Sequence, residues 1–316
     1  MNKQKALVLP FSQIDKEDIP LVGGKGANLG EMAGAGFPIP PGFCVTAEAY
    51  RKLITENDLE PKIKALLADL NVENTKKLNE AAKKVQNLLL RADIPEDITK
   101  QVFSLYRRLK PASKNPLVAV RSSATAEDLP DASFAGQQET YLNIKGEANV
   151  IQAVRQAWAS LFGARAIYYR ATKGFDHFRV ALAIPIQLMV QSEVSGVMFS
   201  VNPVTNNKHQ IVIEAAWGLG DYIVQGVVTP DHYVVNKDSF TIHSRLVSEQ
   251  TVMEVYKYPS GVKKVKVAAK KVEEPKLTDD QIIKLAKIGA AIQKHYYFPQ
   301  DMEWALEDGA LYIVQS

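Results

Sequence analysis

A dense run of glycines near the N-terminus constrains this chain more than any other feature. Six of the eighteen glycines fall between residues 21 and 36, at positions 23, 24, 26, 30, 34 and 36, and the proline-rich stretch 38–42 follows at once. Such density indicates a backbone that needs conformations closed to other residues, or a close approach to another group. Lys25 lies inside the run, where a compact cation beside backbone N–H groups favours a phosphate-sized anion. An ordinary glycine-rich turn is the alternative.

The run is not a Walker A motif. Gly26 and Ala27 follow Lys25, where that motif has serine or threonine to hold magnesium. Residues 28–35 can form a short helix whose first amides face the glycine loop, which is a common way to present N–H donors to an anion.

Helical and extended patterns occupy different parts of the chain. Apolar residues at helical spacing predict helices over residues 46–70, 79–90, 98–109, 150–171 and 279–296. Apolar runs bounded by turn signals predict strands over residues 117–120, 180–190, 196–201, 211–215, 231–235 and 311–314. These elements predict an α+β fold. A chain of 316 residues suits one large domain or two packed lobes, and we expect two lobes.

Composition excludes several classes of function. The chain has 38 basic and 35 acidic residues, and its net charge of +3 is too small for a general nucleic-acid-binding surface. The lysine-rich stretch 263–271 is interpreted as a solvated edge strand. Cys44 is the only cysteine, which excludes an intramolecular disulfide and a multi-cysteine zinc site. The sequence has no signal peptide and no apolar stretch of membrane-spanning length, so we expect a cytoplasmic protein with neither a membrane nor a nucleic-acid partner.

An arginine stands where a buried strand ends. Arg121 follows the apolar run 117–120. The small hydroxyl residues that come next are Ser122, Ser123 and Thr125. Ligand-binding residues commonly lie at this end of a strand, and an arginine fork fits phosphate oxygens, to which the hydroxyl groups can also donate. In the alternative interpretation, Arg121 pairs internally with Glu127 or Asp128.

Two further segments have the composition of nucleotide-contacting elements. The polar, small-residue stretch 131–140 can fold over a triphosphate and exclude water. In a later apolar strand, Gln187 is the polar residue, and an adenine ring can pack against the Leu188, Met189 and Val190 that follow it. Core packing alone also accounts for these apolar residues.

The C-terminal residues predict a hairpin with two oxygen-bearing side chains. Short strands at residues 301–304 and 311–315 flank the turn 307–309. If the strands pair antiparallel, Glu303 and Gln315 lie opposite each other and can hold one hard cation, as magnesium–nucleotide sites require.

Together and in this order, these segments resemble the N-terminal domain of the phosphoenolpyruvate synthase and pyruvate phosphate dikinase family. The matching runs are VGGKGANLG at residues 22–30, PPGF at 40–43, VRSSA at 120–124, EDL at 127–129, SFAGQQET at 133–140 and WGLG at 217–220. The resemblance extends across nearly the whole chain, and the combination of runs is specific although each run alone is weak. Rifampin phosphotransferases are similar too, but residues 133–140 look closer to the synthases.

The resemblance implies an ATP-grasp fold in which ATP lies between two α+β lobes. The N-terminal lobe, residues 1–190, would carry the glycine loop, the helical region and the phosphate loop, and the C-terminal lobe, residues 191–316, the metal-binding strands. Lys25 and Arg121 would bind the phosphates at the catalytic centre. The other implied contacts to ATP and Mg²⁺ are Gly136 and Thr140 in the phosphate-covering loop, Gln187, Met189 and Val190 beside the adenine, and Glu303 and Gln315 at the metal.

The implied activity is ATP-dependent phosphoryl transfer to a histidine on a separate swivelling domain, and then to an acceptor held by another domain. In a phosphoenolpyruvate synthase, ATP, pyruvate and water yield AMP, phosphoenolpyruvate and phosphate. None of the histidines here lies in the Ser-His context of the family's phosphohistidine loop. The family pattern continues with Arg-Pro at the position after Ser316, where the given sequence stops. We therefore expect a chain cut at a domain boundary and incomplete for turnover, or a product that works with separate partner domains. A rifampin phosphotransferase domain and a stand-alone, non-catalytic ATP-binding module are the alternatives.

Overall fold

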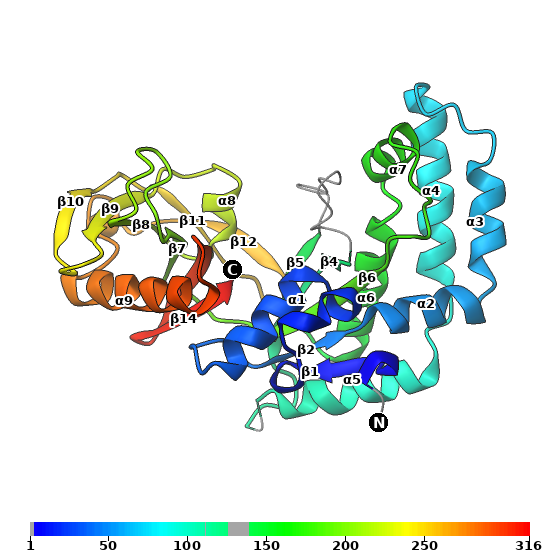
Figure 1. The fold of residues 1–316 in the computed structure, drawn as a ribbon, viewed down its shortest axis with the longest axis horizontal. Helices are drawn as coiled ribbons and strands as arrows, with labels where there is room; N and C mark the ends of the chain where they lie inside the picture. The colour runs from blue at the N-terminus through cyan, green and yellow to red at the C-terminus, as the bar shows by residue number, and fades with distance from the viewer. Residues whose placement is uncertain (1–2, 111, 126–138) are drawn as a thin grey trace. The chain divides into compact units, whose positions relative to one another are not determined.

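The computed structural model describes residues 3–110, 112–125 and 139–316 of the chain, which form two compact units (Figure 1). Unit 1 comprises Met1–Gly34 and Pro41–Met189, and unit 2 comprises Ala35–Pro40 and Val190–Ser316. The chain therefore enters unit 2 briefly, returns to unit 1, and then completes unit 2. None of the described helices is both long and apolar enough to cross a membrane.

Unit 1 is built on an antiparallel sheet. Its strands run in the order β1 (Val8–Pro10), β2 (Gly42–Val45), β6 (Leu182–Leu188), β3 (Leu117–Arg121) and β5 (Thr140–Lys145), and β4 (Ser123–Ala124) also pairs with β6. The helices are α1 (Ile19–Gly34), α2 (Ala47–Glu56), α3 (Leu59–Leu67), α4 (Thr75–Arg91), α5 (Glu96–Arg108), α6 (Glu147–Ser160) and α7 (Ala164–Thr172). Short 3-10 turns precede α1, at Lys3–Lys5, Phe11–Gln13 and Lys16–Asp18. Strand β6 is buried along nearly its whole length, so its continuous apolar sequence forms the centre of the unit.

Side-chain caps mark the start of two helices of unit 1, α2 and α4. The Thr46 hydroxyl accepts a hydrogen bond from the amide of Ala49 at the start of α2, and Asn74 caps α4 in the same way. The single helix predicted over residues 46–70 is in fact two helices. Asp58 stands between them with a left-handed φ of 48°, which ends the helical hydrogen-bond pattern.

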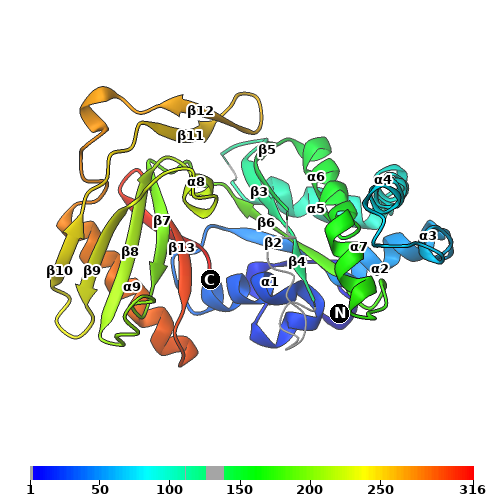
Figure 2. The ribbon, with the colours of Figure 1, turned by 90° about the horizontal axis from the view of Figure 1, so that it is seen from above.

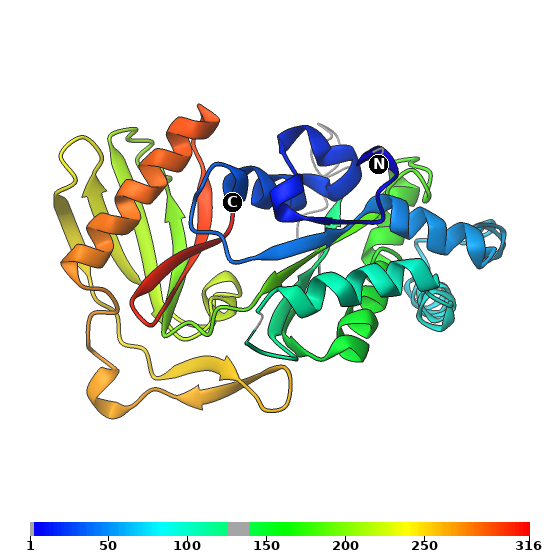
Figure 3. The same cartoon turned by 90° about the horizontal axis from the view of Figure 1, so that it is seen from below.

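Unit 2 contains a second antiparallel sheet. Its strands run in the order β10 (Ile242–Leu246), β9 (Asp231–Asn236), β8 (Gln210–Trp217), β7 (Val194–Phe199), β13 (Asp301–Glu307) and β14 (Ala310–Gln315). Helix α9 (Asp279–Tyr296), the orange helix of Figure 3, packs along one face of the sheet. A Cβ on Gly289 would lie 2.8 Å from the Met198 sulfur, so the glycine lets α9 approach β7 closely. Figure 2 shows the separate two-stranded sheet of β11 (Val252–Tyr256) and β12 (Val262–Lys266). The short elements α8 (Asp221–Val224) and a 3-10 turn at Ala269–Lys271 complete the unit.

A buried ion pair fastens the irregular segments of unit 2 to its sheet. Lys276 Nζ lies 2.8 Å from an Asp231 carboxylate oxygen, and both side chains are fully buried. The same carboxylate accepts hydrogen bonds from the Tyr233 hydroxyl at 2.7 Å and from the backbone amides of Ser248 and Lys276 at 2.9 Å. Because every oxygen is bonded, the geometry meets the condition under which a buried pair is tolerated.

The segment Ala35–Pro40 belongs to unit 2 because it adds to the edge of the second sheet. The Pro38 carbonyl accepts a hydrogen bond of 2.9 Å from the amide of Ile313 in β14. The Phe37 ring meets the ring of His295 edge-on, with 5.8 Å between the ring centres. The early segment Ala35–Pro40 thus covers β14, the last strand of the sequence.

Tyr297, directly after α9, provides a test of backbone strain. Its φ of 65° lies in the left-handed region, and its side chain is 93 % exposed. Glycine is the usual residue at such a helix end, because a Cβ is disfavoured there. We expect Tyr297→Gly to raise the free energy of unfolding by about 1 kcal/mol, measured by urea denaturation. Tyr296→Gly, one residue earlier and inside α9, should instead lower it by about 1 kcal/mol. A loss of stability in Tyr297→Gly would contradict this account.

Candidate functional site

The glycine-rich segment lies against the strand that follows β3. Helix α1 is interrupted at Gly23, whose φ of 68° is one that glycine adopts without steric cost. A Cβ there would come within 2.2 Å of Ser123 Oγ and 2.8 Å of the Ala124 carbonyl oxygen. The amide of Gly26 donates to the same Ser123 hydroxyl at 3.4 Å, across 97 residues of sequence. The fold therefore brings together the first two predicted motifs within unit 1.

Lys25 and Arg121, the predicted phosphate-binding cations, come from these two contacting segments. Lys25 lies in α1 between Gly23 and Gly26 and is half-buried. Arg121 is the last residue of β3, two positions before Ser123, and is only 9 % exposed. Cations on neighbouring segments, beside the amides of a glycine-rich turn, are typical of sites that bind anionic oxygen groups.

The hydroxyl groups after β3 bind the protein itself. The amide of Glu139 donates to Ser122 Oγ at 3.0 Å, and the amide of Ser122 donates to the Glu139 carbonyl at 3.1 Å. The Thr125 hydroxyl donates to the Ala181 carbonyl at 3.2 Å. With the Ser123 bond, these contacts give each of the three hydroxyl groups a partner within unit 1. Their role in the structure is to hold the backbone on both sides of the Arg121 strand.

The predicted phosphate-covering loop is described only at its end. Thr140 pairs with Arg121 in the register of β5 and β3, and its side chain is exposed. Gly136 lies outside the described residues, as do Glu127 and Asp128, the alternative partners of Arg121. Glu139 and Thr140 are therefore the residues of the 131–140 stretch that the structure describes.

Gln187 is a buried polar residue near the end of β6. Its side chain is 2 % exposed, and its Nε2 has no hydrogen-bond partner among the described residues. A buried N–H group without an acceptor costs about 1–3 kcal/mol, so such a group is suited to donate to a bound molecule. Met189 follows the strand, with its amide bonded to the Leu117 carbonyl at 2.9 Å, and Val190 begins the long segment of unit 2.

Glu303 and Gln315 pair as the predicted hairpin requires. The two residues are opposite each other in the register of β13 and β14, beside a bulge, and Gln315 Nε2 donates to Glu303 Oε1 at 3.2 Å. One carboxylate oriented by an amide fits Mg²⁺, which is commonly held by one or two carboxylates, water and phosphate oxygens. In the part of the chain that the structure covers, no group of three or more His, Cys, Asp and Glu side chains could hold a metal by itself.

The WGLG segment of residues 217–220 turns sharply against β11. Gly218 has a φ of 88°, and a Cβ there would lie 2.5 Å from the Glu254 carbonyl oxygen. The side chain of Glu254 is 5 % exposed, and its Oε2 has no hydrogen-bond partner within the described segments. Burial, with a smaller contribution from the charge of Asp221, raises the pKa of Glu254 to about 7. Sequence patterns gave no sign of this carboxyl group, because its burial depends on the contact between β11 and α8.

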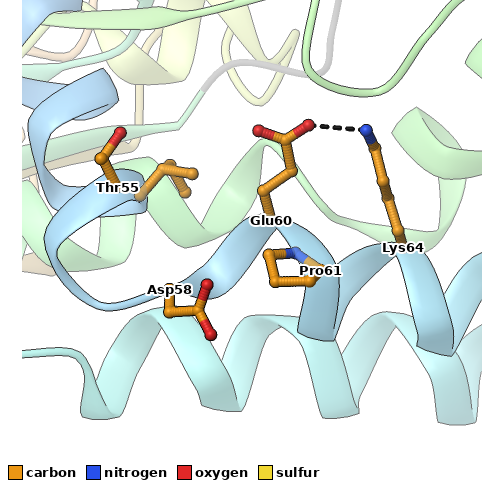
Figure 4. Close-up of a pocket in the computed structure, with 6 residues that line it drawn as sticks. Thr55, Asp58, Glu60, Pro61 and Lys64 are labelled. Carbon is orange, nitrogen blue, oxygen red and sulfur yellow. Dashed lines mark ion pairs between the residues drawn. The ribbon is translucent and has the colours of Figure 1, made fainter.

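A pocket elsewhere in unit 1 contains none of the predicted residues. It has a volume of about 300 Å³, lies where α2 gives way to α3, and is lined by Ile54, Thr55, Asp58, Glu60, Pro61 and Lys64 (Figure 4). Its only lysine is already paired with Glu60 at 2.6 Å. With two carboxylates and a neutralised cation, this pocket is poorly suited to phosphate.

Gly23→Ala tests the contact between the glycine segment and β4. The new methyl group would overlap Ser123 Oγ and force a left-handed alanine, so we expect the free energy of unfolding to fall by more than about 2 kcal/mol. Gly34→Ala is the matched control, because a Cβ at Gly34 meets no described atom within 4 Å. It should change stability by less than about 1 kcal/mol. Equal effects of the two substitutions in chemical denaturation would contradict the packing described here.

Glu254→Gln tests the buried carboxyl group through pH. The folded-state pKa of about 7 lies above the ordinary value of 4.5, so the folded protein binds more protons than the unfolded chain between these values. The stabilising contribution is complete below pH 4.5 and is lost as the pH rises through 7. We expect urea denaturation to show the unmodified protein losing stability relative to Glu254→Gln between pH 5 and pH 8. Glu249→Gln, a matched change at an exposed position, keeps Glu254 and should lose stability in parallel with the unmodified protein. Parallel behaviour of all three proteins would refute the assignment.

Matches to known proteins extend over both units. Residues 19–316 match the family described as "Pyruvate phosphate dikinase, AMP/ATP-binding domain". A probable phosphoenolpyruvate synthase of Methanocaldococcus jannaschii is 48% identical over 308 residues, covering 97% of this chain and 26% of that protein. The phosphoenolpyruvate synthase of Pyrococcus furiosus is 45% identical over 349 residues, covering 97% and 43%. A probable phosphoenolpyruvate synthase of Methanothermobacter thermautotrophicus is 44% identical over 317 residues, covering 100% and 46%.

The chain spans between about a quarter and just under half of the length of these relatives. The resemblance drawn from the sequence motifs is confirmed, and so is the α+β fold class, of the ATP-grasp type. The glycine segment, the Arg121 strand and the Glu303 hairpin all fall inside the matched region. This chain therefore belongs to the pyruvate phosphate dikinase AMP/ATP-binding domain family, with phosphoenolpyruvate synthases among its relatives.

Proposed function

We propose that this chain is the ATP-cleaving part of a phosphoenolpyruvate synthase-type phosphotransferase. It binds Mg²⁺-ATP and passes a phosphoryl group to a histidine on a separate domain, which delivers it to pyruvate. The whole enzyme converts ATP, pyruvate and water to AMP, phosphoenolpyruvate and phosphate. The observation that carries this proposal is the packing of the Lys25 glycine segment on the strand that follows Arg121.

Phosphate binding is assigned to unit 1. Lys25 and Arg121 neutralise the charge of the phosphates, and Thr140 with Gly136 covers them. Neutralising that charge and fixing the phosphates in line are the main contributions that a protein makes to phosphoryl transfer. The unpartnered Nε2 of Gln187 supports an adenine position beside Gln187, Met189 and Val190.

Metal binding is assigned to unit 2. Glu303 and Gln315 hold Mg²⁺, which supplies positive charge to the phosphate oxygens when bound. The hydrogen bond from Gln315 to Glu303 supports this role, because it orients the carboxylate. We propose that units 1 and 2 are the two ATP-grasp lobes predicted as residues 1–190 and 191–316.

The proposal includes partner domains. Phosphoryl acceptance by histidine and binding of pyruvate are assigned to domains outside this chain, in line with the greater length of the relatives. The relatives are phosphoenolpyruvate synthases or probable ones, which favours pyruvate over an antibiotic as the final acceptor. Transfer of label from the β- or γ-phosphate of ATP to an added histidine domain would distinguish this enzyme from a non-catalytic ATP-binding module.

Calorimetric titration with ATP, with and without Mg²⁺, tests the assigned residues. Lys25→Ala and Arg121→Ala should each weaken ATP binding at least about tenfold, because each removes a charge-assisted contact worth more than about 1.4 kcal/mol. Lys64→Ala, in the pocket of Figure 4, is the matched control and should leave the affinity unchanged. In the magnesium arm, Glu303→Gln should reduce the gain in affinity from Mg²⁺, whereas Glu307→Gln on the same strand should not. Unchanged ATP affinity in both Lys25→Ala and Arg121→Ala would contradict the assignment of these residues to the phosphate site.

A further inference from the structure

Arg170 is a buried cation in the core of unit 1. It lies on α7, and its side chain is fully buried. Its Nη2 donates to the Leu161 carbonyl at 2.6 Å, and its Nε donates to Nδ1 of His177 at 3.0 Å. The guanidinium also lies 5.3 Å from the centre of the Phe162 ring. Its Nη1 is buried and has no hydrogen-bond partner in the part of unit 1 that the structure describes.

The groups that surround this cation are neutral. Burial, and then the charge of Arg170, lower the pKa of His177 to about 4, so the imidazole is uncharged at neutral pH and accepts through Nδ1. The charge of Asp176 acts on His177, but the guanidinium forms no ion pair with a described carboxylate, and burial lowers its own pKa to about 10. The cation is therefore without a directly paired counter-charge among the described residues.

A second unpartnered group lies within electrostatic reach of Arg170. Tyr50, on α2, is 2 % exposed, and its hydroxyl oxygen is buried with no hydrogen-bond partner in the described segments. Burial raises the pKa of this hydroxyl, while the charge of Arg170 has the opposite effect. The hydroxyl therefore stays protonated and can donate. The ring is held against Trp158, with 6.2 Å between the ring centres.

Buried charges in proteins are normally paired, and a buried polar group without a partner commonly marks an unseen ion or water. A water molecule would satisfy the Arg170 and Tyr50 donors but would leave the positive charge uncompensated. An anion satisfies both requirements, and its attraction to the guanidinium is strong in a medium of low dielectric constant. We propose that a small monovalent anion of the chloride type binds in the core of unit 1, between Nη1 of Arg170 and the hydroxyl of Tyr50.

The site links the stability of unit 1 to halide concentration, which thermal denaturation can measure. The test compares sodium chloride with sodium gluconate at the same ionic strength and pH. We expect chloride to raise the Tm of the 316-residue chain by about 2–4 °C, with saturation, as for any ligand that binds only the folded state. Equal Tm values in the two salts would overturn the proposal.

Two tyrosine variants separate the site from general salt effects. Tyr50→Phe keeps the ring and removes one anion donor, so it should reduce the chloride-dependent shift by at least half. Tyr106→Phe is the matched control, because the Tyr106 hydroxyl is also buried but donates to the Pro116 carbonyl at 2.6 Å. It should lower Tm equally in both salts and keep the full chloride shift. An undiminished shift in Tyr50→Phe would contradict the location.

Bromide locates the anion directly. In crystals soaked in sodium bromide, we expect an anomalous peak in contact with Nη1 of Arg170. Arg170→Met should lose both the peak and the chloride-dependent shift. If that variant does not fold, the soaked crystals of the unmodified chain and the Tyr50→Phe measurement still test the proposal. Electron density without anomalous signal would indicate an ordered water only and would refute the proposal.

Discussion

The absence of a side chain at Gly23 is the constraint on which the candidate site depends. It lets α1 bend and lie directly on β4, so that the Ser123 hydroxyl reaches the amide of Gly26. Ser122 and Thr125, on either side, are bonded to Glu139 and Ala181. The Arg121 strand is thus held from three directions by backbone groups. The proposed phosphate site would therefore owe its geometry to contacts of the main chain.

Features set by neighbouring residues could be predicted from the sequence, and features set by distant contacts could not. The Glu303–Gln315 pairing follows from a turn signal between two short strands, and the register confirms it. The helix predicted over residues 28–35 is part of the longer α1. The prediction was too short because a helix interrupted by glycines has no clear apolar period. The protein partners of Ser122 and Thr125 were missed, since each lies across the fold. The burial of Glu254 was missed for the same reason.

The two units handle buried cations differently. In unit 2, Lys276 has a carboxylate partner, Asp231, whose oxygens are all engaged. In unit 1, Arg170 is surrounded by a carbonyl, a neutral imidazole and aromatic rings. The first arrangement is complete within the described residues, so it needs no ligand from the solvent. In the Arg170 arrangement, Nη1 has no partner among the described residues. The stability of unit 1 can therefore depend on the ions that the solvent contains.

The placement of residues 35–40 affects how the chain can fold. The Pro38 carbonyl and the Ile313 amide are at opposite ends of the sequence, yet they bond across the edge of one sheet. The entropy of closing so long a loop is lost before that contact forms, which places the completion of unit 2 late in folding. During synthesis, the early segment leaves the ribosome long before its strand partner exists. A fragment that began at residue 190 would leave the β14 edge uncovered, and such edges promote aggregation.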